Sequence, residues 1–232
     1  MSVLYLTPNL LSENTVPKVL PPYVITVIHK LRQFIVEDVR TARRFLSKIK
    51  HPEPIDQLQF RELNEHTPDN EIPSLLPYLM TADTGLLSEA GLPAIADPGA
   101  KIVQLAHANN IAVIPLVGPS SIFLALMASG LNGQSFAFIG YLPVKKSERQ
   151  ERLRILERRS AHERQTQIFI DTPYRNMQLL EDILQCCRPE TKLSIAADIT
   201  GEKEFIMTQS IRQWKNKLPE LNRIPAVFLL QA

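Results

Sequence analysis

Two short turns carry the residue types best suited to holding a small ligand. The first, Ser88-Glu89-Ala90-Gly91, combines a hydroxyl, a carboxylate and two residues small enough for a ligand to approach the backbone. The second is Gly118-Pro119-Ser120-Ser121. Both follow apolar segments, and in a parallel α/β sheet the loops that leave the carboxyl ends of strands line the ligand crevice. Ordinary connections in α/β proteins have a similar composition, so a purely structural interpretation stays open.

Three residues are candidates for proton transfer. Glu65 and His66 are adjacent, and Asp38 follows Glu37 at the end of the apolar segment Phe34-Ile35-Val36. A carboxylate or an imidazole can act as a general base. Neighbouring Glu and His residues also occur by chance, and Glu37-Asp38 would equally cap the helix expected over Val39–Lys50 through its free amides and dipole.

Strands and helices must position these residues, and the sequence predicts that they alternate along the first half of the chain. Hydrophobic patterning and turn signals predict an α/β protein with a mixed sheet at its C-terminal end. The predicted domains are residues 1–116 and 117–232. Residues 51–77, with five prolines, are expected to hold only short strand-like pieces. The expected strands are Val3–Leu6, Phe34–Val36, Leu86-Leu87, Ile111–Leu116, Phe136–Gly140, Gln167–Ile170, Leu193–Ala197, Glu202–Gln209 and Ile224–Gln231. The expected helices are Tyr23–Gln33, Val39–Lys50, Asp97–Asn110, Ile122–Ser129, Lys145–Arg164, Tyr174–Cys187 and Ile211–Leu218.

Charge, cysteine content and the length of apolar runs limit the kinds of protein and compartment that we expect. The 232 residues have a formal charge of +2, which does not by itself indicate a nucleic-acid binder. The basic segment Lys145–Arg164 is interpreted first as a solvated helix with internal charge pairs, and alternatively as a helix that contacts phosphates. The only cysteines, Cys186 and Cys187, are adjacent, which fits a reducing compartment. With no signal segment or long apolar run, we expect a cytoplasmic protein that does not enter a membrane.

Sequence motifs of the commonest enzyme classes are absent. The chain has no glycine-rich dinucleotide fingerprint, no Walker A motif, no Gly-x-Ser-x-Gly and no His-Glu-x-x-His, and it shows no metal-binding cluster. We therefore expect neither a bound metal nor nucleotide hydrolysis, acyl transfer or zinc proteolysis.

The segment from Ser88 to Gly99 resembles a motif of the tetrapyrrole methylase superfamily, the class III S-adenosylmethionine-dependent methyltransferases. The most similar branch is the bacterial 16S ribosomal RNA cytidine 2′-O-methyltransferases, with Ser-Asp-Ala-Gly-x-Pro-x-x-x-Asp-Pro-Gly. This chain differs only at Glu89. Further matching blocks follow the same order and cover most of residues 35–205. They are Glu37-Asp38-Val39-Arg40, Glu65-His66, Pro115–Pro119, Ala128–Leu131 and Gly140–Pro143 with Lys145.

Other blocks depart from the branch. The family's first loop is usually Thr-Pro-x-Gly-Asn-Leu, whereas Thr7-Pro8-Asn9-Leu10 contains no glycine. Asp171–Arg175 keeps only an acid and the Arg of Glu-Ser-x-His-Arg. Ala196–Gly201 lacks both basic residues of its counterpart, and Asn222–Pro225 replaces a Lys-Gly-Glu. These changes reduce the positive charge available for an RNA substrate.

The resemblance implies two α/β domains with S-adenosylmethionine in the cleft between them, and a homodimer. It also implies which residues serve the site. Glu89 would accept from a ribose hydroxyl or the amino group of the cofactor, and Glu65, His66 and Asp38 are the candidate bases. The implied cofactor-binding residues are Pro8, Ser88, Glu89, Ala90, Gly91, Pro119, Ser120, Ser121, Asp171 and Ala226.

Three functions follow as hypotheses. The first is methylation of RNA, ribosomal RNA foremost, for which salt-dependent RNA binding would be evidence. The second is methylation of a small tetrapyrrole or corrin, which predicts an apolar cleft with little basic surface. The third is a non-catalytic paralogue that binds the cofactor or a partner without turnover.

Overall fold

The computed structural model describes residues 2–232. Contacts within the chain divide it into two compact units, Met1–Ser120 and Ser121–Ala232. Each unit is built on one five-stranded sheet with helices packed against it, so the α/β class expected from the sequence is confirmed.

The sheet of the first unit is entirely parallel, with the order β3-β2-β4-β1-β5. Two of its three inner strands, β2 and β4, are buried along their whole length, as expected for a parallel sheet that is covered on both faces. The strands are β1 (Val3–Thr7), β2 (Gln33–Val36), β3 (Gln59–Glu62), β4 (Thr84–Leu87) and β5 (Ala112–Pro115).

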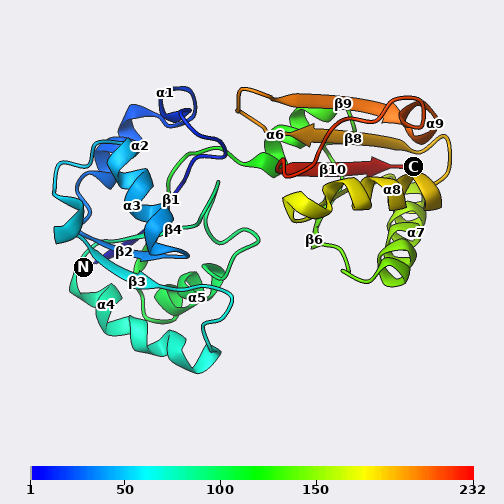
Figure 1. Ribbon diagram of the computed structural model, residues 1–232. Coiled ribbons are helices and arrows are strands. Elements are labelled where there is room, and N and C mark those ends of the chain that lie inside the picture. The colour runs from blue at the N-terminus through cyan, green and yellow to red at the C-terminus, as the bar shows by residue number, and fades with distance from the viewer. Residues whose placement is uncertain (1) are drawn as a thin grey trace. The chain divides into compact units, whose positions relative to one another are not determined.

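Alternation along the strands divides the core of the first unit into two layers. Phe34 and Val36 pack with one hydrophobic cluster, and Ile35 packs with the other. Helices α2 and α3 cover the first face, and α4 and α5 cover the second (Figure 1). The helices are α1 (Val16–Val19), α2 (Pro22–Ile28), α3 (Val39–Lys48), α4 (Leu76–Thr81) and α5 (Ala100–Ala108), with 3₁₀ turns η1 (Ile55–Gln57) and η2 (Asp69–Leu75).

The second unit has a mixed sheet with the order β6-β7-β10-β8-β9. Only the β6–β7 pair is parallel; the other three pairs are antiparallel. The strands are β6 (Phe136–Tyr141), β7 (Thr166–Ile170), β8 (Lys192–Ala197), β9 (Phe205–Ser210) and β10 (Ala226–Gln231). The helices are α6 (Ser121–Ser129), α7 (Lys146–Glu163), α8 (Asn176–Cys186) and α9 (Ile211–Trp214), with the 3₁₀ turn η3 (Pro173–Arg175).

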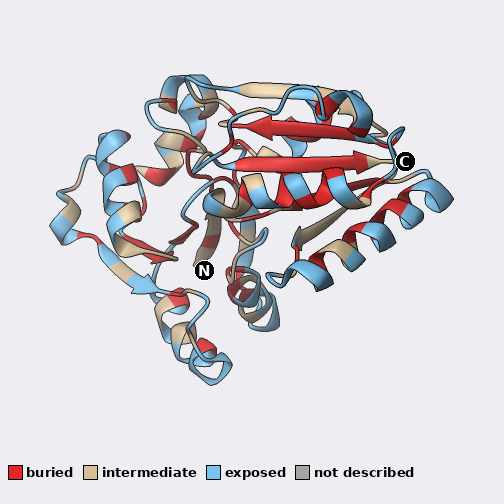
Figure 2. Ribbon diagram, turned by 45° about the vertical axis from the view of Figure 1, so that its right-hand side comes forward, coloured by how far each residue is buried: buried red, intermediate tan, exposed pale blue. Residues whose placement is uncertain are grey.

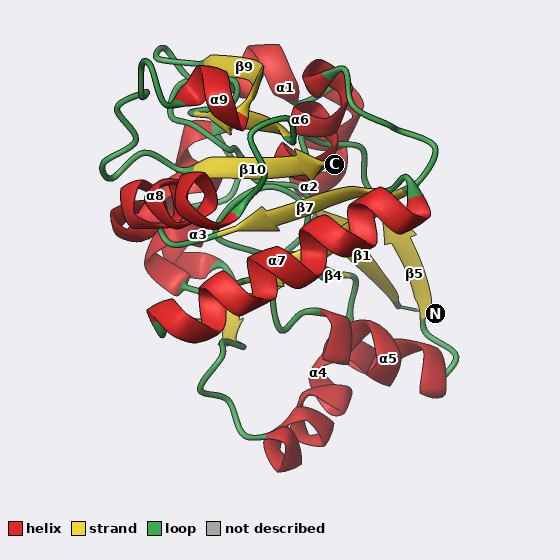
Figure 3. Cartoon of the chain, turned by 90° about the vertical axis from the view of Figure 1, so that its right-hand side faces the viewer, coloured by secondary structure: helices red, strands yellow, loops and turns green. Residues whose placement is uncertain are grey.

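One large core holds the second unit together. Leucines of α7 and α8 pack on inward-facing residues of β7, β8 and β10, including the stacked pair Phe169 and Phe228. The central strands β8 and β10 are buried except at one terminal residue each, whereas the helices expose their outer faces (Figure 2). Figure 3 shows α7 running across β7. Charge pairs three or four residues apart, such as Arg159–Glu163, lie along α7 and support its interpretation as a solvated, charge-paired helix.

Several predicted boundaries were wrong. The helix expected to extend to Gln33 ends at Ile28, because Gln33 begins β2 and its side chain donates to the carbonyls of Tyr78 and Ala82. The strand expected from Glu202 begins at Phe205, because side chains of Asp198 and Glu204 accept from backbone amides of an intervening turn. The proline-rich stretch 51–77 contains helical turns that local patterning did not reveal.

Candidate functional site

The strand order of the first unit creates a switch point between β1 and β4. These strands are neighbours, but the chain leaves β1 toward β2 on one side and leaves β4 toward β5 on the other. Ligands of open parallel α/β sheets bind in the crevice outside the carboxyl ends of two such strands. The loops at this position begin at Pro8 and at Ser88, and both contain residues that the sequence singles out.

Asn9 ties these two loops together. Its backbone amide donates to the carbonyl of Gly91 at 2.8 Å. Its side-chain Nδ2 donates to the carbonyls of Ser88 at 3.0 Å and Glu89 at 2.9 Å. Because Asn9 is buried, these bonds fix the backbone of the Ser88–Gly91 turn from one side.

Glycines allow close packing between the loops that follow β1, β4 and β5. A Cβ atom on Gly118 would lie 2.1 Å from Cβ of Pro8. Gly91 has a φ of +70°, and a Cβ there would lie 3.2 Å from Leu11 and 3.5 Å from the Pro119 carbonyl oxygen. Within the first unit, the structure therefore brings together three of the predicted cofactor-binding residues, Pro8, Gly91 and Pro119.

The segment between β4 and α5 does not start a helix at Asp97, as the Asp-Pro sequence predicted. Oδ1 of Asp97 accepts from the amides of Ala94 at 2.9 Å and Gly99 at 2.7 Å, and α5 begins only at Ala100. Two alanines, Ala94 and Ala96, have φ values of 67° and 63°. Left-handed backbone at non-glycine residues is unfavourable and is concentrated at functional sites, which makes this loop part of the candidate site.

Carboxylates gather at the same edge of the sheet. Oε2 of Glu37 accepts from the backbone amide of Glu89 at 3.1 Å. Burial, with the neighbouring carboxylates of Asp97, Glu65 and Asp38, raises the pKa of Glu37. Burial also raises the pKa of Glu89, helped by Glu37 and Asp38, and burial raises that of Asp97. These carboxyl groups repel one another, so a cation or a hydrogen-bond donor that approached the edge would be attracted.

The three candidate bases have different surroundings. Asp38 caps α3, where Oδ1 accepts from the amide of Thr41 at 2.6 Å, and this hydrogen bond lowers the pKa of Asp38. A lowered pKa makes a carboxylate a weaker base. Glu65 and His66 follow the outer strand β3, which β2 separates from β4. Their side chains are each 84% exposed and lie 3.7 Å apart between Nε2 and Oε1.

The remaining predicted residues lie around the boundary of the units or in the second one. Ser120 ends the first unit, and Ser121 begins α6. Asp171 follows β7 and Ala226 begins β10, an adjacent antiparallel strand, so both lie at the same edge of the second sheet. Oδ1 of Asp171 accepts from Arg175 and from the amide of Thr172, whereas its buried Oδ2 has no hydrogen-bond partner among residues 2–232.

Sequence reasoning missed two residues that shape the Ser88–Gly91 turn. The sequence indicates Asn9 only as part of a candidate ligand loop, Thr7-Pro8-Asn9, that lacks the family's glycine, and Glu37 only as part of a matching block and of a helix cap. Both act across strand neighbours in the sheet, and no signal local to their own segments indicates this. Knowledge of the strand order would have indicated it, since β1 and β2 both pair with β4.

Within residues 2–232, no group of three or more His, Cys, Asp and Glu could hold a metal ion. No helix in that range is both long and apolar enough to cross a membrane. What the first unit does present is a fixed turn with an exposed Glu89 and Ala90, flanked by carboxylates. Such an edge can bind a polar organic ligand through backbone groups and carboxylate oxygens.

Comparisons of the sequence with known proteins identify relatives of this chain. No family model matches the chain. Ribosomal RNA small subunit methyltransferase I of Xylella fastidiosa is 33% identical over 165 residues, 71% of this chain and 57% of that protein. The proteins of the same name from Vibrio cholerae and Synechocystis are 31% and 30% identical over 183 residues, covering 78% and 79% of this chain and 60% and 63% of theirs.

Solved structures share the fold at low sequence identity. The methyltransferase CobJ superposes with a TM-score of 0.66 at 14% identity, covering 100% of this chain and 94% of that one. Uroporphyrin-III C-methyl transferase from Thermus thermophilus, complexed with S-adenosyl homocysteine, has a TM-score of 0.58 at 15% identity and covers 99% and 97%. The chain belongs to the family of ribosomal RNA small subunit methyltransferase I, and it shares its fold with these two methyltransferases of known structure. The resemblance noted in its sequence is confirmed.

The chain spans less than two thirds of the length of the first curated relatives that it matches.

Proposed function

We propose that this protein is an S-adenosylmethionine-dependent methyltransferase that acts on RNA, with ribosomal RNA as its substrate class. The observation that carries the proposal is the Ser88–Gly91 turn, which Asn9 and Glu37 hold at the switch point between β1 and β4. The same fold occurs in methyltransferases of known structure. The relatives of at least 30% identity described above are named for methylation of small-subunit ribosomal RNA.

The residues of the turn fit the methyl donor. Glu89 and Ala90 are exposed, while Ser88 and Gly91 are buried and anchored. The Glu89 carboxylate can accept from ribose hydroxyls or from the amino group of the donor. The small side chain of Ala90 lets a ligand approach the backbone. When bound, S-adenosylmethionine supplies an electrophilic methyl group, and positioning of the acceptor contributes much of the rate acceleration.

We also propose roles for the other predicted residues. Pro8, Pro119, Ser120, Ser121, Asp171 and Ala226 complete the donor site, and residues 1–116 and 117–232 are the two domains. A base is needed only if the acceptor is a hydroxyl group. Glu65 or His66 fits that role better than Asp38, whose lowered pKa weakens it as a base. A homodimer in the cytoplasm is the assembly and location that we propose with this function.

Methylation of a small tetrapyrrole or corrin is a second candidate. The observation that favours it is the fold similarity to CobJ and to uroporphyrin-III C-methyl transferase. A protein that binds the donor without turnover is the third. The lack of a glycine beside Asn9 and the lack of basic residues in Ala196–Gly201 favour it over RNA methylation.

One assay distinguishes the three. The protein is incubated with labelled S-adenosylmethionine and, separately, with small ribosomal subunits or a mixture of corrinoids, while calorimetry measures binding of the donor. We expect label in ribosomal RNA. Label in corrinoids alone supports the second function, and donor binding without transfer supports the third. If wild-type protein shows no heat with the donor, the methyltransferase proposal is wrong.

A substitution links that result to the turn. Gly91→Val places a side chain at a positive φ and against Leu11, so we expect it to abolish donor binding. Gly133→Ala is the matched control, because a Cβ there meets nothing within 4 Å. Thermal unfolding of both variants checks that each retains its fold.

A further inference from the structure

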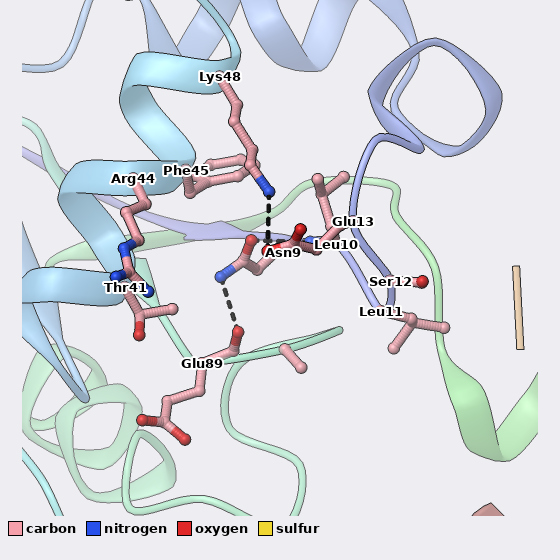
Figure 4. A pocket seen from close by; sticks show the side chains of 11 residues that line it. Asn9, Leu10, Leu11, Ser12, Glu13, Thr41, Arg44, Phe45, Lys48 and Glu89 are labelled. Carbon is pink, nitrogen blue, oxygen red and sulfur yellow. Dashed lines mark hydrogen bonds and ion pairs between the residues drawn. The ribbon is translucent and has the colours of Figure 1, made fainter. Parts of the chain in front are cut away.

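A cavity of about 220 Å³ lies beside the Ser88–Gly91 turn. Its walls are the loop after β1, one face of α3, and Glu89 with Ala90 (Figure 4). The pocket therefore adjoins the proposed donor turn but extends away from it toward α3. Nothing in the proposed donor site accounts for this extension.

Two cations line the α3 wall. Arg44 and Lys48 are four residues apart, which places them on the same face of the helix. Arg44 is exposed and forms no ion pair with any residue between 2 and 232, although its charge helps to lower the pKa of Asp38. Figure 4 shows the Lys48 ammonium directed at the loop that carries Glu13, which it meets at 3.6 Å.

The neighbouring Arg43 lies on the same helix but differs from Arg44 in its ion pairing. Arg43 forms an ion pair with Asp56, whereas Arg44 has no such partner in the described part of the chain. The Lys48–Glu13 pair is loose, and the Glu13 side chain is 86% exposed. Exposed pairs of this kind contribute little to stability, so Glu13 can be displaced from Lys48 by a stronger anion.

We infer that this pocket binds a phosphodiester of the RNA acceptor strand, held by Arg44 and Lys48. The inference rests on the proposed function and names the part of the substrate that this pocket recognises. Arg presents a planar fork that matches phosphate oxygens, and Lys adds a point charge. Because Glu89 and Ala90 form the opposite wall, a phosphate bound here would hold its nucleotide next to the donor turn.

Removal of the Glu13 carboxylate provides a second test of the inference. In the free protein this carboxylate pairs with Lys48, and in the RNA complex the phosphate would replace it as the partner of Lys48. Removing the carboxylate therefore strengthens RNA binding, whereas removing either cation weakens it. A role of these residues in folding alone would not produce opposite effects on RNA affinity.

Two assays test the inference: binding of a single-stranded RNA of mixed sequence, and methylation of small ribosomal subunits. Each is carried out with wild type, Arg44→Gln, Lys48→Gln and Glu13→Gln. Arg43→Gln is the control on the same helix. We expect Arg44→Gln to weaken RNA binding about tenfold, the loss of a charge-assisted contact. Each lost cation should reduce the slope of log affinity against log salt by about 0.7. Glu13→Gln should bind RNA a few-fold more tightly.

Kinetics and donor binding separate the inference from the proposed function. We expect KM for ribosomal subunits to rise in Arg44→Gln and Lys48→Gln while kcat and the donor Kd stay constant. If wild type methylates RNA but these variants keep its KM and salt slope, the pocket assignment is wrong and the function stands. If wild type transfers no methyl group to RNA yet the variants change RNA affinity as described, the function fails and the phosphate site remains. If wild type does not bind RNA, both fail.

Discussion

The two units treat charged side chains in opposite ways. In the second unit, Arg149 and Asp182 form an ion pair at 2.5 Å with side chains that are each only 1% exposed. At the carboxyl edge of the first sheet, Glu37, Glu89 and Asp97 have raised pKa values and no cationic side chain forms an ion pair with them in the described part of the chain. The difference indicates that charges in the second unit stabilise its fold, whereas the charged edge of the first unit is left available for a ligand.

The hydrogen bonds around Asp182 strengthen this contrast. Its carboxylate accepts from Nε and Nη2 of Arg149 and from the side chain of Gln150, while Arg149 also donates to the carbonyls of Pro143 and Val144. The pair therefore fixes the start of α7 against α8. In the first unit the comparable hydrogen bonds of Asn9 and Glu37 end on one turn and fix the backbone of a site.

The largest expected effect is on the buried pair of the second unit. Asp182→Asn leaves the Arg149 charge inside without a counter-charge, and we expect a loss of about 3–5 kcal/mol in the free energy of unfolding. Chemical denaturation measures it. Glu151→Gln, which removes a carboxylate paired at the surface with Arg154 and Arg158, should change stability by less than about 0.5 kcal/mol. Equal effects of the two variants would contradict the contrast between buried and exposed charge.

A smaller effect is expected where the loops of the first unit meet. Gly118→Val drives a branched side chain into the Pro8 ring, and we expect a loss of about 2–3 kcal/mol together with weaker donor binding. Denaturation and calorimetry on the same samples measure the two changes. Wild-type stability in Gly118→Val would show that these loops do not pack as described.

A substitution at Asn9 tests whether the loop after β1 holds the Ser88–Gly91 turn in place. Asn9→Ala removes the donors to the carbonyls of Ser88 and Glu89, and we expect a loss of about 1–2 kcal/mol. Donor affinity should fall more than stability does, because the turn remains folded but loses its fixed geometry. Asn132→Ala is a comparison in the second unit, since Asn132 also bonds backbone groups. It should lower stability and leave donor affinity unchanged.

The smallest effect concerns the pH dependence of the first unit. A carboxyl group whose pKa is raised on folding binds its proton more tightly in the folded state, so its contribution to stability falls as pH rises past the ordinary value of 4.5. Glu37→Gln keeps an oxygen that can accept from Glu89 and removes the charge. We expect it to be more stable than wild type at pH 7 and equal to it well below pH 4.5.

Unfolding curves over this pH range test the direction. An advantage of Glu37→Gln that grows toward acid would reverse the sign and show that Glu37 is stabilised as a carboxylate. Asp38→Asn should behave in the opposite way. Its pKa is lowered by the Thr41 amide, so the loss of stability in this variant should appear at neutral pH and disappear in acid.

Local chemistry in the sequence determined much of this protein. Apolar runs and turn residues identified most helices and the strands other than β3, which lies in a stretch expected to hold only short strand-like pieces. Asp38 caps α3 because its carboxylate reaches an amide only three residues away. The Ser88–Gly91 turn and its superfamily motif are also contiguous. Such features depend on neighbours along the chain, so they can be recognised before the fold is known.

Tertiary structure decided how these segments meet. Whether β4 lies between β1 and β2 depends on pairing between residues about 50 to 80 positions apart, for which no local signal exists. That pairing alone turns Asn9 and Glu37 into the supports of the Ser88–Gly91 turn, and it sets Glu65 and His66 two strands away from it. The Asp97-Pro98 sequence shows the same limit: its capping signal was outweighed by hydrogen bonds that hold a left-handed loop in place.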